Sequence, residues 1–466
     1  MKWIALLLSL SLLVATHELG HLLFAKLFRT RVRRYYIFFN PYFSIIKAKK
    51  FGGKWHFLFF NSNTPDSWDE KNLAPEDQDN TLWGLGWLPL GGYCDIAGMI
   101  DETKSADDLE SEPQPWEYRT KPAWQRLCII SGGVLVNFIT ALVLYGVILG
   151  HWGEYEVPMH AATFGYQYHE VMLDEGFRHG DVIYAIDGKP MDDYSEVNKV
   201  LLLGDPEEVS VRRGDSVATV YMSGHLVENV NRQRVKSLMD PRTPFVLDAV
   251  SDGSPAARAG LQEGDSLVSF NGEAMPVFYD FSTALRSHPD EEVCIGYYRG
   301  GQLDSVRLTI RDNGTIGVVA SRDLQRFFPE IKHIEYSFFE AIPAGISRGW
   351  ESMVTYVSSL KMLFAPGGSQ NLGGFKSMAD LFPSNWNWQA FWNLTALLAL
   401  VLAFMNVIPI PGLDGGHILF TLWEIVSGRK PSEKFLTVAQ NVGMFLLIAL
   451  MIWANGNDIL RWLGLM

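Results

Sequence analysis

Apolar residues occur in long uninterrupted blocks along this chain, and the polar residues are concentrated between those blocks. A helix needs roughly 20 apolar residues to cross a hydrocarbon layer about 30 Å thick, and four blocks meet this requirement. The first block is too long for a signal peptide, and no small-residue cleavage site follows it. We therefore expect an α-helical membrane protein with four transmembrane helices, at residues 1–28, 124–150, 391–414 and 435–455.

Basic residues flank these predicted helices on one side. Clusters of Lys and Arg indicate the cytoplasmic side of a membrane, and four passes put all three clusters there. Both termini and residues 151–389 then face the opposite side, and residues 29–123 form a β-rich, membrane-associated region on the cytoplasmic side. The three clusters are Arg29, Arg31, Arg33, Arg34, Lys47, Lys49 and Lys50; Arg119, Lys121 and Arg126; and Arg429, Lys430 and Lys434.

The long insert between the second and third helices contains a repeated pattern. In each copy a run of β-forming residues lies between two turns. The copies resemble bacterial PDZ domains, which are β-rich α+β modules, at residues 151–245 and 246–325; another kind of β-rich pair is the alternative. The first copy reads Gly176-Phe177-x-x-Gly180-Asp181, then Asp187-Gly188, and the second reads Gly260-Leu261-x-x-Gly264-Asp265, then Asn271-Gly272.

Residues 333–365 have the spacing of an amphipathic helix, with apolar residues three or four positions apart. Two placements suit such a helix. It can lie along the membrane face before the third pass, or it can pack as a soluble helix on the second PDZ-like copy.

The first membrane helix carries an HExxH motif, His17-Glu18-Leu19-Gly20-His21. Residues four apart share one helix face, so both imidazoles can bind one metal ion with Glu18 beside it. Two neutral imidazoles suit Zn²⁺, and Glu18 can then accept a proton from water and deliver it to a leaving amine. The alternative is that these polar residues only mediate packing between membrane helices.

A third protein ligand is expected where Pro409 and Pro411 interrupt the third membrane helix. The backbone groups that such a break exposes must be satisfied by protein or line a cavity. Asp414 is the best candidate, because the two glycines after it could let the backbone approach the metal closely. A helix-capping role for Asp414 and a ligand role for His417 are the alternatives.

Together these features resemble the site-2 protease family of zinc intramembrane proteases, and most of all its bacterial regulator-of-sigma-E protease branch. The resemblance covers essentially the whole chain. It implies zinc held by His17, His21 and Asp414, with Glu18 as the acid/base residue. It rests on HExxH, on the PDZ-like insert and on Asn406-x-x-Pro409-x-Pro411-x-Leu413-Asp414-Gly415-Gly416.

The resemblance also implies positions that contact the substrate. An edge strand at Leu88–Tyr93 could pair with an extended stretch of substrate. The chain departs from the family pattern at Val134, where a proline is usual, and at Asn40-Pro41, where a Gly-x-Gly turn is usual. The implied substrate-binding residues are Asn406, Pro409, Pro411, Asn137, Leu90, Gly91 and Gly92.

Composition narrows the class of partner. The formal net charge is −13, which argues against a nucleic-acid partner because phosphate binding needs a basic face. The three cysteines, Cys94, Cys128 and Cys294, lie far apart and form no CxxC pair, so neither a disulfide scaffold nor a cysteine zinc site is expected.

Together with the motifs, the resemblance to the site-2 protease family implies a zinc-dependent endopeptidase of the bacterial inner membrane that cuts the transmembrane segments of single-pass proteins. The resemblance implies an anti-sigma factor or signal-peptide remnants as substrates, trimmed first by an upstream site-1 protease. It also favours a PDZ pair on the periplasmic side that filters substrates by size, with recruitment as the other option. A membrane-anchored PDZ scaffold or chaperone with an inactive metal site, and a transporter built on broken helices, are the competing hypotheses.

Overall fold

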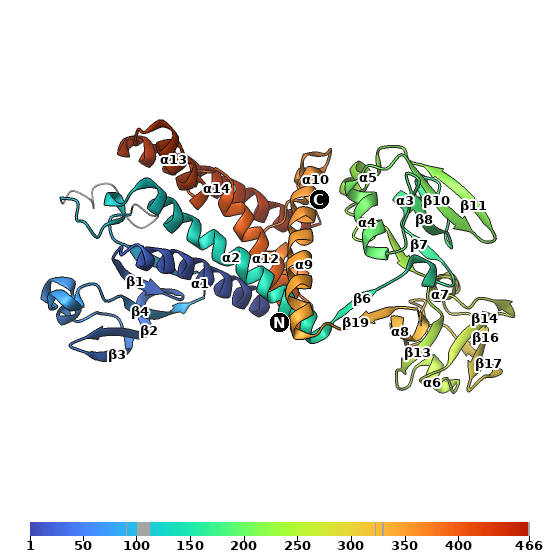
Figure 1. Ribbon diagram of the computed structural model, residues 1–466. Coiled ribbons are helices and arrows are strands. Elements are labelled where there is room, and N and C mark those ends of the chain that lie inside the picture. The colour runs from blue at the N-terminus through green and yellow to red at the C-terminus, as the bar shows by residue number, and fades with distance from the viewer. Residues whose placement is uncertain (90, 100–111, 322, 329, 465–466) are drawn as a thin grey trace. The chain divides into compact units, whose positions relative to one another are not determined.

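The computed structural model describes residues 1–89, 91–99, 112–321, 323–328 and 330–464 (Figure 1). The chain forms two compact units. The helical unit comprises Met1–Gly153, Glu335–Ser358 and Leu372–Met466, and the insert unit comprises Glu154–Ile334 and Ser359–Asn371. Leu90, one of the predicted substrate-binding residues, lies outside the described residues.

The four predicted membrane helices are present in the helical unit. Each is long and apolar enough to cross a membrane. The third stops at Val407 and not at 414, because Ile408 precedes Pro409 and adopts an extended ψ of 132°. The four are α1 (Lys2–Leu27), α2 (Ala123–Trp152), α12 (Trp388–Val407) and α14 (Glu433–Trp462).

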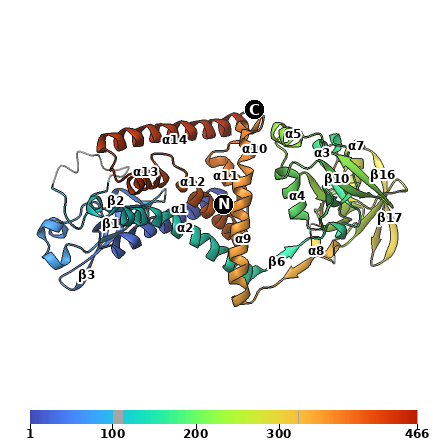
Figure 2. The ribbon, with the colours of Figure 1, turned by 45° about the horizontal axis from the view of Figure 1, so that its top comes forward.

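Helices α1, α2 and α12 form the apolar core of this unit, which includes Leu13, Ala141, Tyr145, Ala399 and Leu400. By contrast, α14 is almost entirely exposed along its apolar stretch, and Figure 2 shows it on the outside of the unit. A burial this small suits a helix whose apolar surface faces lipid.

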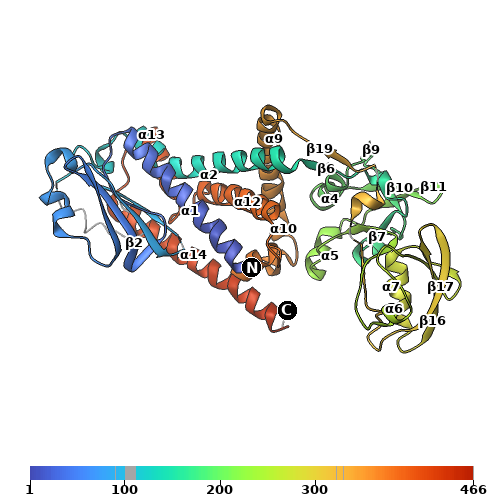
Figure 3. The same ribbon diagram turned by 90° about the horizontal axis from the view of Figure 1, so that it is seen from below.

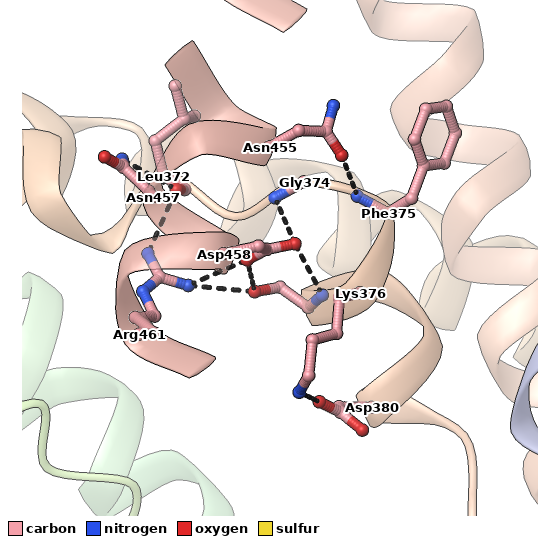
Figure 4. A network of polar contacts seen from close by, with 10 residues as sticks. Leu372, Gly374, Phe375, Lys376, Asp380, Asn455, Asn457, Asp458 and Arg461 are labelled. Atoms are coloured by element: carbon pink, nitrogen blue, oxygen red, sulfur yellow. Dashed lines mark hydrogen bonds and ion pairs between the residues drawn. The ribbon is translucent and has the colours of Figure 1, made fainter. Parts of the chain in front are cut away.

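A polar network attaches the end of α14 to α11 (Phe375–Leu381), as Figure 4 shows. The buried Asp458 carboxylate accepts hydrogen bonds from the Gly374 and Ser377 backbone N–H groups at 3.1 and 3.0 Å, and Arg461 donates to the Ser377 hydroxyl at 2.8 Å. Lys2 forms an ion pair with Asp380 on the same helix at 3.1 Å. The beginning of α1 and the end of α14 therefore lie at the same end of the helical unit.

A five-stranded sheet lies at the other end of α1 (Figures 1 and 3). Its order is β3-β2-β4-β1-β5, with β1 and β4 parallel and the other neighbours antiparallel. This sheet confirms the predicted β-rich region. Its strands are β1 (Val32–Tyr36), β2 (Phe39–Phe51), β3 (Lys54–Asn61), β4 (Leu82–Leu88) and β5 (Tyr93–Ile96).

The predicted edge strand at Leu88–Tyr93 is wrong in its position. Strand β4 ends at Leu88, β5 begins at Tyr93, and the described residues between them are not in a strand. Pro89 has no N–H group for a strand ladder, and Gly91 has a φ of +149°. The two edge strands of the described sheet are β3 and β5.

The three basic clusters meet at the sheet end of the helical unit. The Lys121 ammonium donates to the Arg29 carbonyl oxygen at 3.2 Å, which joins the first cluster to the second. Arg126 on α2 forms an ion pair with Glu424 on α13 (Asp414–Ser427) at 2.5 Å, just before the third cluster. The segments that the charge pattern assigns to one side of the membrane thus lie side by side.

The predicted amphipathic helix is α9 (Phe338–Ser359), followed by the short α10 (Lys361–Phe364). Ala341, Gly345 and Gly349 form a small-residue face on α9. A Cβ atom added to Gly345 would collide with the backbone of Gly146 on α2. Because this face packs on α2, α9 belongs to the helical unit and not to the PDZ-like insert.

The insert unit contains two larger sheets, of four and six strands, with short helices between the strands. Each sheet belongs to a separate apolar core. The first copy contains β7 (Tyr166–Tyr168), α3 (Glu170–Asp174), β8 (Val182–Ile186), β9 (Lys189–Pro190), α4 (Tyr194–Leu203), β10 (Glu208–Arg213), β11 (Ser216–Tyr221), α5 (Leu226–Gln233) and β12 (Met239–Pro241). The second contains β13 (Phe245–Val250), α6 (Pro255–Arg258), β14 (Ser266–Phe270), β15 (Glu273–Ala274), α7 (Phe278–Ser287), β16 (Glu292–Arg299), β17 (Gln302–Thr309) and β18 (Val318–Ala320).

Helix α8 (Leu324–Phe327) follows the second copy. Two short strands, β6 (Glu154–Glu156) and β19 (Lys332–Ile334), then pair antiparallel. This ladder brings together the two ends of the insert, close to the points where the chain leaves and rejoins the helical unit.

The two copies of the repeated pattern adopt matching local structure. Asp181 and Asp265 are both buried, and each accepts a two-pronged bond from an arginine, Arg213 at 2.8 and 2.7 Å and Arg299 at 2.7 and 2.6 Å. The hydrogen bond to Asp181 raises the pKa of Arg213 above its ordinary value. The same buried turn is thus stabilised in the same way in both copies.

Candidate active site

Three potential metal ligands converge inside the helical unit. The two histidines lie one helical turn apart on α1, and Asp414 begins α13. The Asp414 Oδ2 atom lies 3.1 Å from His17 Nε2 and 3.5 Å from His21 Nε2, and the two Nε2 atoms are 3.2 Å apart. Two segments almost 400 residues apart in the sequence therefore place three donor atoms around a single point, two from α1 and one from α13.

The donor set fits zinc. Four ligands at tetrahedral Zn–N and Zn–O distances of about 2.0–2.1 Å stand roughly 3.3 Å from one another, which is the size of the triangle formed here. Among the described residues, the buried Oδ2 atom of Asp414 has no hydrogen-bond partner. A buried carboxylate oxygen without a donor is costly unless a cation compensates its charge. His17, His21 and Asp414 would hold the ion.

The break after α12 positions Asp414. Leu413 is the N-cap residue of α13 and no side chain caps that helix, so the capping alternative for Asp414 is wrong. A Cβ atom on Gly416 would lie 2.7 Å from the Pro411 Cα atom, and one on Gly415 would meet the Ile408 backbone. The two glycines therefore let the proline loop fold back tightly on α13. This close backbone contact explains why residues without a Cβ atom occupy positions 415 and 416.

Helix α2 approaches both histidines closely. A Cβ atom on Gly133 would lie 2.6 Å from His17 Cε1 and 2.6 Å from His21 Nε2. The backbones also touch, since a Cβ atom on Gly20 would lie 2.8 Å from the Gly133 Cα atom. The carbonyl oxygen of Ile129 accepts a hydrogen bond from His21 Nδ1 at 2.9 Å. Such contacts orient metal ligands and fix which ring nitrogen is free.

Glu18 lines a cavity of about 230 Å³ beside the three ligands. Tyr35 on β1 donates to the Ala15 carbonyl oxygen at 2.8 Å and ties the sheet to α1. Burial, and after it the Glu18 carboxylate, raise the pKa of the Tyr35 phenol well above its ordinary value, so this donor stays protonated. The walls come from the sheet edge, the proline loop, α13 and α14, with Tyr93, Cys94, Ile96, Gly412, His417 and Gln440 among them.

The predicted substrate-binding residues occupy different places. Asn406 and Gly92 line the cavity. Gly91 packs on the Phe39 ring, and Pro409 and Pro411 shape the loop that carries Asp414. Asn137 is completely buried behind His17 and does not reach the cavity wall.

Several site residues were missed by the sequence reasoning. Gly133 and Gly20 allow the close crossing of α1 and α2, and Gln440 is the contribution of α14 to the cavity. The glycines could have been found from their type, because small residues mark close contacts between membrane helices. No local signal distinguishes Gln440 from other polar residues in that helix.

The chain belongs to peptidase family M50, whose pattern it matches over residues 5–62 and 70–450. It is therefore a metalloprotease of the site-2 type, and the four apolar helices of membrane-spanning length among its described residues make it a membrane protein. This confirms the family and the enzyme class expected from the sequence.

Individual relatives resemble the chain along its whole length. It is 28% identical to the regulator of sigma-E protease RseP of Salmonella typhimurium, with 98% of each chain covered. It is 27% identical to the regulator of sigma E protease of Haemophilus influenzae and to protease RseP of Yersinia pestis, again with 98% of each chain covered.

Proposed function

We propose that this metalloprotease is a zinc-dependent endopeptidase that cuts single-pass membrane proteins within their transmembrane segments. One observation carries the proposal: Asp414 converges with His17 and His21 beside Glu18, and the helix that carries both histidines and Glu18 is apolar enough to span a membrane. A single-pass reporter with a short outer domain tests it. The expected product is cut inside the membrane segment, and a cut confined to the outer flank would contradict the proposal.

Each residue of the site has a distinct part in hydrolysis. Bound zinc would polarise the scissile carbonyl and lower the pKa of water, while His17, His21 and Asp414 hold the ion. Glu18 takes a proton from the attacking water as the new C–O bond forms, and it delivers that proton to the nitrogen as the C–N bond breaks. Asn406 lies on the cavity wall, where its amide can hydrogen-bond the substrate backbone.

The substrate class follows from the relatives. Three of them carry names that include regulation of sigma E or RseP, which points to an anti-sigma factor as substrate, with signal-peptide remnants as a second class. An upstream site-1 protease would trim the outer domain first. A broken substrate helix must then present an extended stretch, because a peptide bond inside a helix is shielded by its hydrogen-bonded turn.

Strand β5 is the element best placed to hold such a stretch. It is an edge strand of the described sheet, and its residues Tyr93, Cys94 and Ile96 line the same cavity as Glu18. An extended peptide that pairs with this edge would gain main-chain hydrogen bonds and pass the catalytic residues.

Disulfide cross-linking can test strand pairing. The enzyme would carry Glu18→Gln to keep substrate uncut, and Cys128→Ser with Cys294→Ser to leave only Cys94. We expect cross-links to a series of single-cysteine substrates to peak at every second position, because strand side chains alternate with a period of two. A variant that retains only Cys128 is the matched control. A period of three to four would mean that the substrate remains helical in the cavity.

The proposed location is the inner membrane of a bacterial cell, with the insert and both termini on the periplasmic side. The shared position of the three basic clusters supports this orientation. Strand β3 also exposes Trp55, Phe57 and Phe59 on alternate positions of one sheet face. Aromatic side chains of this kind suit the membrane interface, which favours a sheet that lies against the cytoplasmic leaflet.

We propose that the insert unit is a PDZ pair that filters substrates by size. The matching buried Asp–Arg turn in both copies, at Asp181 and at Asp265, supports a pair of domains of one kind. The role as a size filter follows from the family resemblance. Replacing residues 157–331 with a short glycine linker would leave β6 and β19 able to pair. We expect this variant to cut a reporter with a bulky outer domain that the intact chain leaves uncut. Loss of cleavage of an already trimmed reporter, with zinc content unchanged, would favour recruitment instead.

A further inference from the structure

We infer that Asn137 is a positioning residue that holds His17 in the tautomer able to bind zinc through Nε2, and that Thr16 orients Asn137. The inference rests on the proposed zinc chemistry and goes beyond it, because it assigns a role in the metal site to a residue for which the sequence suggested substrate contact. It comes from a chain of three short polar contacts in the interior of the helical unit.

The contacts link α1 to α2. The amide nitrogen Nδ2 of Asn137 lies 3.5 Å from His17 Nδ1, and its oxygen Oδ1 lies 3.0 Å from the Thr16 hydroxyl oxygen. The same hydroxyl lies 3.0 Å from the Leu13 carbonyl oxygen. Asn137 has no exposed surface, so these neighbours must satisfy its amide.

Counting donors and acceptors selects one arrangement. His17 Nε2 faces Asp414 Oδ2 and must offer a lone pair to a metal, so Nδ1 carries the proton of the neutral ring. The two ends of the Asn137 amide must then exchange places, which turns its oxygen toward His17 Nδ1, since the NH₂ group would otherwise face another donor. The NH₂ group consequently donates to the Thr16 hydroxyl, whose single proton goes to the Leu13 carbonyl oxygen. With the Nε2 lone pair of His17 reserved for a metal, only this orientation pairs a donor with an acceptor at each of the three contacts, and such counting distinguishes the two ends of an amide.

His21 supplies an independent parallel. Its Nδ1 lies 2.9 Å from the Ile129 carbonyl oxygen, which can only accept, so His21 also carries its proton on Nδ1 and leaves Nε2 free. Ile129, Gly133 and Asn137 are spaced four residues apart and share one face of α2. That face provides an acceptor for each histidine and, between them, a glycine that leaves room for both rings.

Zinc affinity of the purified protein, measured by competition with a chelator, tests the inference without reference to proteolysis. We expect Asn137→Leu to weaken zinc binding by about 10- to 100-fold, as loss of an outer hydrogen bond to a ligating histidine does elsewhere. Asn137→Asp keeps an acceptor at the same place and should retain most of the affinity. Thr16→Val should cause a smaller loss than Asn137→Leu.

The controls separate orientation from folding and from substrate binding. Thr395→Val removes another buried threonine hydroxyl, which donates to the Phe391 carbonyl oxygen of its own helix, and should leave zinc affinity unchanged. With Co²⁺ in place of zinc, Asn137→Asp should keep the wild-type visible spectrum. Wild-type affinity in Asn137→Leu, or equal losses in Asn137→Leu and Asn137→Asp, would overturn the inference. Failure of the proposed proteolysis alone would leave these affinities as expected.

Discussion

Glu18→Gln should abolish cleavage of a trimmed single-pass reporter and leave the bound zinc in place. Glutamine has nearly the shape of glutamate but cannot accept the proton of the attacking water. General acid–base catalysis contributes about 10²- to 10⁴-fold, and Glu18 would act in both directions of proton transfer, so we expect a loss near the upper end of that range. The measurement is the amount of reporter cut within its membrane segment, together with the zinc content of the purified enzyme.

Asp414→Ala provides the contrast to Glu18→Gln. It removes one of three protein ligands, so both zinc and cleavage should be lost. Cleavage by Glu18→Gln at the rate of the intact chain would assign the proton transfer to another group. Loss of zinc in Glu18→Gln would show that Glu18 supports the metal site itself.

Gly133→Val should empty the metal site although Gly133 is not a ligand. Its new side chain would occupy the space of the His17 and His21 rings, which lie 2.6 Å from the position of the first added carbon. Because metal ligands tolerate displacements of only about 0.5 Å, we expect zinc affinity to fall by about 100-fold or more and cleavage to disappear with it. Chelator competition and the reporter assay measure the two effects.

Gly456→Val is the matched control for Gly133→Val. Gly456 is also a glycine within a membrane helix, and nothing lies within 4 Å of an added Cβ atom there. This variant should keep its zinc and its activity. Wild-type zinc affinity in Gly133→Val would mean that α1 and α2 can separate enough to accept three carbon atoms, and the tight crossing would then not determine the site.

Local features of the sequence were sufficient to predict the membrane helices, the two histidine ligands and the break after the third helix. The apolar blocks predicted four helices because helix length in a membrane depends only on the thickness of the hydrocarbon layer. The HExxH spacing predicted two imidazoles on one face of α1, because a helix repeats every 3.6 residues. The break at Pro409 was equally visible, since proline cannot continue a helix whatever surrounds it.

Contacts between segments far apart in the chain could not be predicted from such local features. The strand expected at Leu88–Tyr93 starts instead at Tyr93, since strand limits depend on the neighbour that each residue meets, here β1. Asn137 was expected to contact substrate, and its position behind His17 follows from how α2 crosses α1.

The sequence by itself determined the class of the chain, its membrane helices and the residue types of the metal site, because these depend on composition and on spacing within one element. Only the tertiary structure brought Asp414, the ligand that the sequence favoured over His417, within 3.5 Å of both histidines. It also decided that β5 forms the cavity edge and that Gly133 makes room for the imidazoles. Those outcomes depend on the packing of elements far apart in the chain. That packing is set by the shape and volume of all the side chains between them, which no local pattern records.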